Sequence, residues 1–390
     1  MTLPRYLAVI GGSYVGVNTA QQLAARFQGR FRLLLIEKNS HFQHLFAFPR
    51  FAVAKGVNTH KAFIPYIPGT FANCPPDSGT VVQARVTGIS DTSIQLDRKV
   101  LLDGQQVDSI PYAYLVIATG TKLTPPSSLP GSEKLEGVQY LQKHAATVAK
   151  SSTIVIIGGG AVGVQMATDI KELYPEKSVT LVHSREQLMN KFHHGLDEII
   201  KDRCRELGIN LKLGSRVKVP SKGYPTDGSQ FNVELTDGST IPADFAIICT
   251  GMTPQSTLLE SLSPASIGED GFIKTLKTLQ IGDTMHPNIF AVGDVAATGA
   301  HKAARPGGRQ AEIVTNNIDH LLNDEPLEQY DVMDPPAIHL SLGIKKNLVF
   351  RNPAPGSSDS PVIKHRDDGQ FDMNIDGVWT RRGGGPNALL

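Results

Sequence analysis

Hydrophobic residues near the N-terminus gather into two short runs with an amphipathic segment between them. Residues 6–10 and, apart from Arg32, residues 31–36 are apolar over the length of a buried strand, while residues 17–27 place small and apolar side chains at helical spacing. Two runs of strand length around a segment of helical period predict a βαβ unit, in which the strands are parallel.

The turn that joins the first of these strands to the helix is rich in glycine. Residues 11–16 read GGSYVG, so Ser13 stands at the middle glycine position of the G-x-G-x-x-G pattern, and Glu37 closes the second strand. Such a turn lets a pyrophosphate lie against backbone N–H groups at a helix N-terminus, and the acid accepts hydrogen bonds from ribose hydroxyls. A small serine side chain still fits and can bond the phosphate. The predicted dinucleotide-binding residues are Gly11, Gly12, Ser13, Gly16, Glu37 and Lys38.

The same order of segments returns after Ser151. A mostly apolar run over residues 153–157 leads into GGGAVG at 158–163, then a segment of helical period over 164–173. A predicted strand over 178–182 follows, in which Ser178 and Thr180 alternate with apolar residues. All three glycine positions of the pattern are filled here, by Gly158, Gly160 and Gly163. One such turn is a weak signal, but two turns that each follow a strand and open a helix indicate two nucleotide sites.

The second strand of this later unit ends in His183, Ser184 and Arg185 instead of an acid. An acid at this place selects the free 2′-hydroxyl of NAD, whereas a hydroxyl and a guanidinium suit the 2′-phosphate of NADP. The sequence therefore favours NADPH over NADH. The alternative is that Arg185 is only a solvated residue at a helix start.

Two further strands end in matching turns of small residues. Residues 114–117 lead into ATG at 118–120, and residues 245–248 lead into CTG at 249–251. Small residues let the backbone approach a nucleotide, and the likeness of the two turns predicts paired crossings of the chain between domains. The candidate nucleotide contacts from these turns are Ala118, Thr119, Gly120 and Gly251.

A late apolar run, residues 289–292, delivers Gly293 and Asp294 at its end. The carboxylate can bond a ribityl hydroxyl there, or it can simply cap the turn that follows. Beyond Lys302 the sequence predicts a helix over about residues 309–322. A helix N-terminus aimed at the pyrimidine edge of a flavin stabilises the negative charge that reduction places there, and a lysine adds to that field.

Residues 39–61 are rich in aromatic side chains and contain His44. In a flavin fold this segment passes close to the isoalloxazine ring, where its rings pack the cofactor or an apolar acceptor; an aromatic loop in the core is the alternative. Flavin-dependent disulfide reductases carry two redox cysteines in this segment, and this chain has none there. Electron relay through protein thiols is therefore not expected.

Composition narrows the class of protein. Among 390 residues, 38 Lys and Arg face 37 Asp and Glu, so nothing indicates a partner that is nucleic acid or an anionic membrane. The wide spacing of Cys74, Cys204 and Cys249 suits free thiols in a reducing compartment. No apolar run approaches the roughly 18 residues of a membrane span, and no secretory signal pattern opens the chain. We expect an intracellular, cytoplasmic protein, with mitochondrial association left open, and no transmembrane segment or metal site.

Other segments predict further elements. We expect strands over residues 81–87 and 93–96, a helix over 188–207, and short strands over 210–219, 230–235, 240–241, 337–342 and 348–350. Residues 381–385 resemble a mobile tail.

Three motifs carry a resemblance to a known family: YPEKSVTLVHS at residues 174–184, CTG at 249–251 and FAVGD at 290–294. The chain resembles the FAD-dependent pyridine nucleotide oxidoreductases that bind two dinucleotides, most closely the branch related to apoptosis-inducing factor and the ferroptosis-suppressor quinone reductase. The resemblance implies that the first unit and Asp294 bind FAD and that the second unit binds NAD(P)H. It also implies catalytic roles for Lys302, which matches a lysine beside the flavin, and for His44. Departures are Ser13, Val295 where a cysteine is common, and Thr2 in place of a myristoylated glycine.

The expected fold is α/β, with two Rossmann-like dinucleotide-binding domains of the flavin disulfide-reductase type and a small C-terminal α+β region. We place the first part of the FAD-binding domain at residues 1–124, the NAD(P)H-binding domain at 125–248, the second part of the FAD-binding domain at 249–330 and the small region at 331–390.

The leading functional hypothesis is an oxidoreductase that passes hydride from NAD(P)H through FAD to a quinone-like or other small-molecule acceptor. No motif in the sequence encodes the oligomeric state, and a homodimer is left open. One alternative is a tailoring flavoprotein oxidoreductase or oxidase of specialised metabolism. A second is a signalling or nucleic-acid-binding protein with a structural flavin, for which the few paired basic residues provide too little basic surface.

Overall fold

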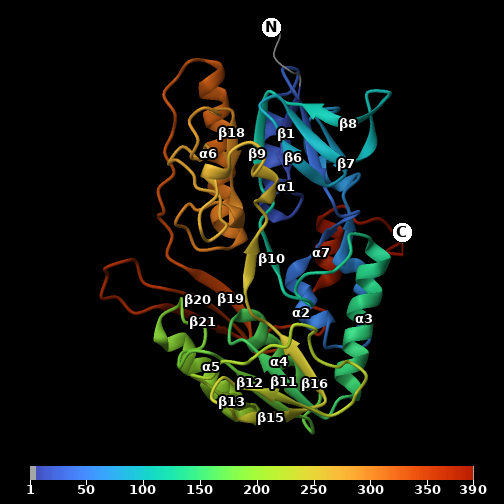
Figure 1. Ribbon diagram of the computed structural model, residues 1–390, viewed down its shortest axis with the longest axis vertical. Coiled ribbons are helices and arrows are strands. Elements are labelled where there is room, and N and C mark those ends of the chain that lie inside the picture. The colour runs from blue at the N-terminus through green and yellow to red at the C-terminus, as the bar shows by residue number, and fades with distance from the viewer. Residues whose placement is uncertain (1–5, 390) are drawn as a thin grey trace.

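The computed structural model describes residues 6–389, and its first sheet is built around the N-terminal strand (Figure 1). All pairs in this sheet are parallel. Its strands, in spatial order, are β18 (Ile289–Ala291), β9 (Tyr114–Ile117), β1 (Tyr6–Ile10), β2 (Arg32–Glu37) and β5 (Gly79–Gln83). Every residue of β1 is buried, as expected for a parallel strand covered on both faces. The late strand β18 thus returns to the sheet that the N-terminal unit begins.

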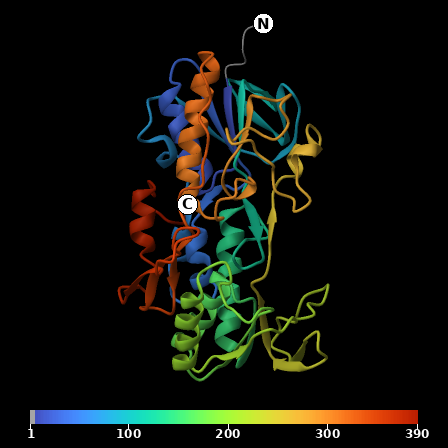
Figure 2. The same ribbon diagram turned by 90° about the vertical axis from the view of Figure 1, so that its left-hand side faces the viewer.

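Two helices, α1 (Tyr14–Arg26) and α6 (Ala304–Leu322), lie side by side on this sheet (Figures 1 and 2). A Cβ atom at Gly307 would lie 2.3 Å from Cγ2 of Val15, so this close approach requires glycine. Both helices begin earlier than predicted, at residue 14 rather than 17 and at 304 rather than 309. The chain takes helical geometry as soon as it leaves each turn, and Pro306 is tolerated within a first helical turn.

The second sheet is also parallel, in the order β13 (Asn210–Lys212), β12 (Ser178–Val182), β11 (Thr153–Ile157) and β16 (Phe245–Ile248). Its helices are α4 (Ala161–Leu173) and α5 (His194–Leu207). The predicted helix over 188–207 is wrong in its first six residues, because Met189 has a φ of 50°, which an α-helix does not allow. The predicted strand over 210–219 is likewise only three residues long.

Two short strands connect the regions of the two sheets. β10 (Thr121–Leu123) pairs in antiparallel fashion with β17 (Met252–Pro254), between the upper and lower sheets of Figure 1. Each strand directly follows one of the small-residue turns, and Gly120 and Gly251 have φ values of 65° and 77°. The prediction of paired crossings is confirmed.

Smaller elements complete the chain outside the two parallel sheets. The antiparallel pairs and sheets are β3 (His41–Gln43) with β4 (Phe63–Pro65), β6 (Val86–Ile89) with β7 (Ser93–Leu102) and β8 (Gln105–Pro111), and β14 (Phe231–Glu234) with β15 (Thr240–Ala243). The remaining helices here are α2 (Phe48–Phe51) and α3 (Lys134–Lys150). The sequence analysis missed α3, although Val138, Leu141 and Ala145 are buried at helical spacing.

The C-terminal region forms the sheet β19 (Ala337–Ser341), β20 (Asn347–Arg351) and β21 (Val362–Arg366), followed by α7 (Ile375–Arg381). The prediction of a mobile tail is wrong, because residues beyond α7 are held in place. The backbone N–H of Gly384 donates to the carbonyl of Trp379 at 2.8 Å, and the Trp379 indole donates to the carbonyl of Gly385 at 2.9 Å.

Hydrophobic packing joins the parts of the chain. Alternate residues of β1 face opposite sides of the first sheet, with Leu7 and Val9 in one core and Ala8 and Ile10 in another. The first of these cores continues through both parallel sheets to Trp379. In the part of the chain that the structure describes, no helix combines the length and apolar character needed to cross a membrane.

Candidate functional site

The first glycine turn is built so closely that side chains cannot replace its outer glycines. Gly11 has a φ of 105°, and a Cβ atom there would lie 2.4 Å from the carbonyl oxygen of Ala118 at the end of β9. A Cβ atom at Gly16 would lie 1.8 Å from the carbonyl oxygen of Gly11. These contacts press the turn and the N-terminus of α1 against the sheet. The N–H of Gly11 donates to the carbonyl of Ile36 at 2.9 Å, so the N–H groups of the first turn of α1 are the ones that can face a pyrophosphate.

Glu37 is fixed beside this turn, at the end of β2. Its buried carboxylate accepts hydrogen bonds from the backbone N–H of Gly12 and, at 2.8 Å, from that of Asn39. The Tyr66 hydroxyl donates to the carbonyl of Gly12 at 2.8 Å and closes the other side of the turn. The carboxylate is therefore held in one place, at the position where the sequence predicts a ribose contact.

Ser13 and Lys38 flank these groups. Ser13 precedes α1 in extended geometry, and its hydroxyl makes no capping hydrogen bond. Lys38 donates from Nζ to Oδ1 of Asn39 at 3.1 Å, and burial lowers the pKa of its ammonium group. The hydroxyl of Ser13 is thus not used to cap α1, at the turn where the sequence predicts a phosphate contact.

The second glycine turn repeats the geometry of the first. Gly158 has a φ of 121°, and a Cβ atom there would lie 2.5 Å from the carbonyl oxygen of Cys249, at the end of β16. A Cβ atom at Gly163 would lie 1.9 Å from the carbonyl oxygen of Gly158, whereas Gly160 has open space beside it. Open space at the middle glycine is what the close approach of a pyrophosphate to the backbone needs.

His183 occupies the place in the second unit that Glu37 has in the first. In the sheet registers Ile10 pairs with Ile36 and Ile157 pairs with Val182, so the next residue is Glu37 in one unit and His183 in the other. The N–H of Gly159 donates to Nδ1 of His183 at 3.1 Å, as Gly12 donates to Glu37. No acid stands at the ribose position of the second unit.

His183 is surrounded by apolar burial, the guanidinium of Arg185 and the carboxylate of Asp197, whose charge has the smaller effect on the imidazole pKa. The side chain is 8% exposed, and its buried Nε2 has no hydrogen-bond partner among residues 6–389. Burial lowers the pKa of the imidazole, and the charge of Arg185 lowers it further. Ser184 and Arg185 are exposed next to it. The three predicted residues therefore do lie together beside the second glycine turn.

Asp294 and Lys302 lie close enough for their charges to interact. Gly293, with a φ of 71°, donates its N–H to Oε1 of Gln310 at 2.7 Å, which fixes the turn after β18. Burial raises the pKa of Asp294 and lowers that of Lys302, while each charge opposes the shift of the other. Lys302 Nζ donates to the carbonyl of Ala296. The carboxylate and the ammonium thus stand just before the N-terminus of α6.

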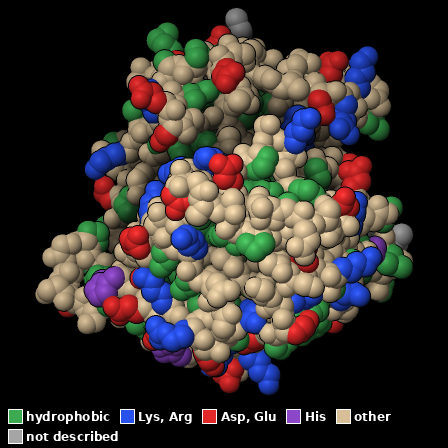
Figure 3. Space-filling model, turned by 60° about the horizontal axis from the view of Figure 1, so that its bottom comes forward, with side chains coloured by type: hydrophobic (Ala, Val, Ile, Leu, Met, Phe, Trp, Pro, Cys, Tyr) green, Lys and Arg blue, Asp and Glu red, His purple; other side chains and the backbone are tan. Residues whose placement is uncertain are grey.

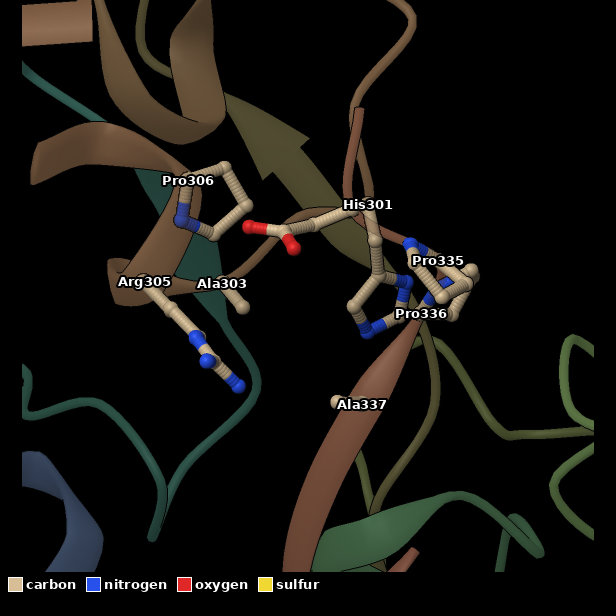
Figure 4. Close-up of a pocket in the computed structure, with 8 residues that line it drawn as sticks. His301, Ala303, Arg305, Pro306, Pro335, Pro336 and Ala337 are labelled. Atoms are coloured by element: carbon tan, nitrogen blue, oxygen red, sulfur yellow. The ribbon is translucent and has the colours of Figure 1, made fainter. Parts of the chain in front are cut away.

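A small cavity of about 20 Å³ adjoins this helix start. Figure 4 shows Arg305 and Pro306 on one side of it, and the ring of His301 beside Pro335 and Pro336 on the other. The cavity lies where the chain enters α6 and where the segment before β19 passes. The residues that lead into α6 thus face the two prolines before β19 across this cavity.

His44 belongs to a cluster of rings at the start of α1. The Tyr14 hydroxyl and His44 Nδ1 are hydrogen-bonded at 2.9 Å, and the rings of Tyr14 and Phe46 lie 4.9 Å apart. Burial lowers the pKa of His44 to about 4, and the charges of Arg382 and Arg381 act in the same direction. His44 is therefore neutral near pH 7 and serves as a hydrogen-bonding group rather than as an imidazolium acid.

The structure also reveals residues that the sequence analysis missed. Tyr14, Tyr66 and Arg382 all border the first glycine turn, and the guanidinium of Arg382 lies 3.7 Å from the ring centroid of Phe42. No local motif marks these residues. The nearest signal is Trp379, whose large apolar ring favours burial and therefore an ordered segment around it.

Together these features define a class of protein. In each of the two parallel sheets a glycine turn follows the first strand, and the antiparallel pair of β10 and β17 connects the two regions. The late strand β18 joins the first sheet and is followed by Asp294. These features define a flavoprotein with two dinucleotide sites. The chain belongs to the pyridine nucleotide-disulphide oxidoreductase family, whose model matches residues 5–317. The protein is an FAD-dependent NAD(P)H oxidoreductase.

Individual relatives agree with this assignment. Fe-regulated protein 8 of Mycosarcoma maydis is 35% identical over 97% of this chain and 94% of its own length. Ferroptosis suppressor protein 1 of Mus musculus is 29% identical over 88% of this chain and 87% of its own. The sulfide:quinone oxidoreductase structure from Aquifex aeolicus has a TM-score of 0.73 and 19% identity, covering 98% of this chain and 92% of that one. The predicted resemblance and fold class are confirmed.

Proposed function

We propose that this protein transfers hydride from NADPH to FAD and passes two electrons on to a quinone-like small molecule without a protein thiol. The observation that carries this proposal is the pair of matched glycine turns, one with Glu37 and the other with His183 at the ribose position. The bound flavin supplies the redox chemistry, and the protein supplies binding, orientation and charge. The balanced reaction consumes NADPH, a proton and the quinone, and gives NADP⁺ and the quinol.

The nucleotide preference rests on the second turn. A ribose 2′-hydroxyl needs an acceptor such as Glu37, while a 2′-phosphate needs donors and positive charge. His183, Ser184 and the exposed guanidinium of Arg185 provide the second kind of surroundings. NADPH is therefore the preferred donor, and NADH binds with fewer contacts.

The proposal that electrons pass directly from the flavin to the acceptor rests on the state of the three cysteines. Burial raises the pKa of Cys204 and Cys249 to about 12, and raises that of Cys74. All three are free and lie in different elements. A thiol relay requires a reactive thiolate beside the flavin and a partner thiol, and the residues predicted near the flavin include neither.

The proposal of a quinone-like acceptor rests on positive charge and on an apolar surface of the protein. In this proposal Lys302 and the N-terminus of α6 would supply positive charge to the reduced flavin, which carries negative charge. Phe46, 57% exposed beside His44, offers an aromatic surface to a flat apolar acceptor. The structural neighbour from Aquifex aeolicus is a sulfide:quinone oxidoreductase, which supports a quinone-like acceptor here. The face in Figure 3 mixes acidic and basic side chains and so offers no continuous basic patch to a nucleic acid.

An anaerobic titration tests this proposal. The purified protein is mixed with NADPH and separately with NADH while the flavin absorbance is followed, and a quinone is then added. We expect fast bleaching with NADPH, slower bleaching with NADH, and recovery of the absorbance on addition of the quinone. Equal rates with both nucleotides would contradict the 2′-phosphate argument, and absence of bleaching would favour a structural flavin or an oxidase.

A further inference from the structure

The C-terminal segment places an arginine against the first glycine turn. The guanidinium carbon of Arg382, the residue after α7, lies 3.7 Å from the ring centroid of Phe42 and 5.3 Å from that of Tyr14. The backbone holds it there, because the N–H of Arg382 donates to the carbonyl of Val378 at 3.1 Å. A Cβ atom at Gly69 would lie 2.0 Å from the carbonyl oxygen of Arg382. The backbone at Arg382 therefore packs directly against the backbone at Gly69.

The rings beneath Arg382 are those that border the phosphate-binding turn. Tyr14 is the first residue of α1 and directly follows Ser13. Tyr66 donates its hydroxyl to the carbonyl of Gly12, and its ring lies 6.4 Å from that of Phe42. Phe42 and Tyr14 are themselves in edge-on contact at 5.1 Å. The guanidinium therefore lies on the rings of Phe42 and Tyr14, and Tyr66 extends this ring shelf to Gly12 of the first glycine turn.

No carboxylate among residues 6–389 forms an ion pair with Arg382. The charged or titratable groups that act on it there are Tyr14, Tyr66 and Arg381. Burial raises the pKa of both tyrosines, so both are neutral near pH 7. Contact with aromatic rings compensates part of the cost of burying a cation. A partly buried guanidinium without a counter-ion is otherwise expensive, and a bound anion removes that cost.

We propose that Arg382 binds the pyrophosphate of FAD, so that the C-terminal segment completes the flavin site. The planar guanidinium can donate two hydrogen bonds to phosphate oxygens while one of its faces stays on the ring shelf. The residue lies outside the span 5–317 that the family model matches, so this contact is an addition to the two-dinucleotide fold. The proposal uses the FAD dependence of the protein and is independent of the electron acceptor.

Flavin binding to the flavin-free protein tests this proposal directly. We compare the Kd for FAD, measured by quenching of flavin fluorescence, in wild type, Arg382→Gln and the matched control Arg381→Gln, which changes the exposed neighbour. We expect the Kd for FAD to rise about tenfold or more in Arg382→Gln and to stay near wild type in the control. Equal Kd values in the two variants would overturn the proposal. The assay uses no nicotinamide nucleotide and no acceptor, so it can fail while the proposed reaction stands.

Riboflavin separates contact with the pyrophosphate from general damage to the site. Because riboflavin has no phosphate, we expect Arg382→Gln to leave its Kd unchanged, and an equal loss for FAD and riboflavin would contradict the inference. Arg382→Lys keeps a positive charge on the ring shelf. This variant is measured in place of Arg382→Gln if Arg382→Gln does not fold. We expect a Kd for FAD about threefold above wild type, since lysine lacks the two-point donor; an unchanged Kd would count against a phosphate contact.

Discussion

Arg50 and Asp169 form a two-point ion pair between α2 and α4, with Nε to Oδ2 at 2.7 Å and Nη2 to Oδ1 at 2.9 Å. Their side chains are 1% and 0% exposed. Arg50 also donates to the backbone carbonyls of Gly343, Gln370 and Phe371 at 2.9 to 3.2 Å. One side chain thus joins the aromatic segment of the first unit, a helix of the second unit and the C-terminal region that carries Arg382.

Removing the acid of this pair should destabilise the whole protein. Asp169→Ala leaves a buried guanidinium without its counter-ion, and such losses cost about 3–5 kcal/mol. We expect this drop in the free energy of unfolding, measured by urea denaturation. The exposed pair Lys218 and Glu234 provides the control, and Glu234→Ala should cost less than about 1 kcal/mol. Similar losses in the two variants would show that the buried pair does not join the parts of the chain.

Asp294 should be needed to retain FAD. Its carboxylate stands at the end of β18, beside Lys302, where it accepts a hydrogen bond from the flavin ribityl chain in our interpretation. Asp294→Ala should weaken FAD binding about tenfold, so the purified variant should show a lower ratio of flavin to protein absorbance. Asp108→Ala, at an exposed position of β8, is the control. A variant of Asp294 that purifies fully loaded and yellow would exclude this role.

The two glycine turns could be predicted because their geometry depends on neighbouring residues. The strand, the glycines and the helix of each unit lie within about 20 residues, so the periodicity of hydrophobic residues and the glycine spacing contain the needed information. The predicted start of α5 was wrong because a positive φ at Met189 interrupts an otherwise helical pattern. Arg382 and Phe42 meet across the whole length of the chain, and no local pattern encodes such a contact.

Arg185 should determine the preference between NADPH and NADH. Its exposed guanidinium adjoins His183, at the place where the 2′-phosphate of NADPH is expected. Arg185→Ala should raise the KM for NADPH about tenfold, the cost of one charge-assisted contact, and leave the KM for NADH unchanged. Arg205→Ala removes an exposed arginine from α5 and should change neither. Steady-state kinetics with a quinone acceptor measures both constants, and equal effects on the two nucleotides would refute the assignment.

The stability of the flavin-free protein should fall as the pH is lowered. Burial lowers the pKa of His44 from 6.5 to about 4 in the folded protein, and that of His144 likewise. Between pH 6.5 and about pH 4 the unfolded chain binds more protons than the folded one. The free energy of unfolding therefore rises with pH across this window, and acidification through the window lowers it. The positive charges of Arg381 and Arg382 act on His44 in the same direction as burial.

Replacement of His44 isolates its share of this pH dependence. In His44→Gln the loss of unfolding free energy between pH 7 and pH 4 should be about 2 kcal/mol smaller than in wild type, after allowance for the partial exposure of the ring. Urea denaturation at a series of pH values gives the two curves, and subtracting them removes the contribution of the carboxylates. His365→Gln, on the exposed strand β21, should keep the wild-type slope. If the two variants lose stability in parallel with wild type, the imidazole of His44 is not held in its neutral form by the ring cluster and the C-terminal arginines.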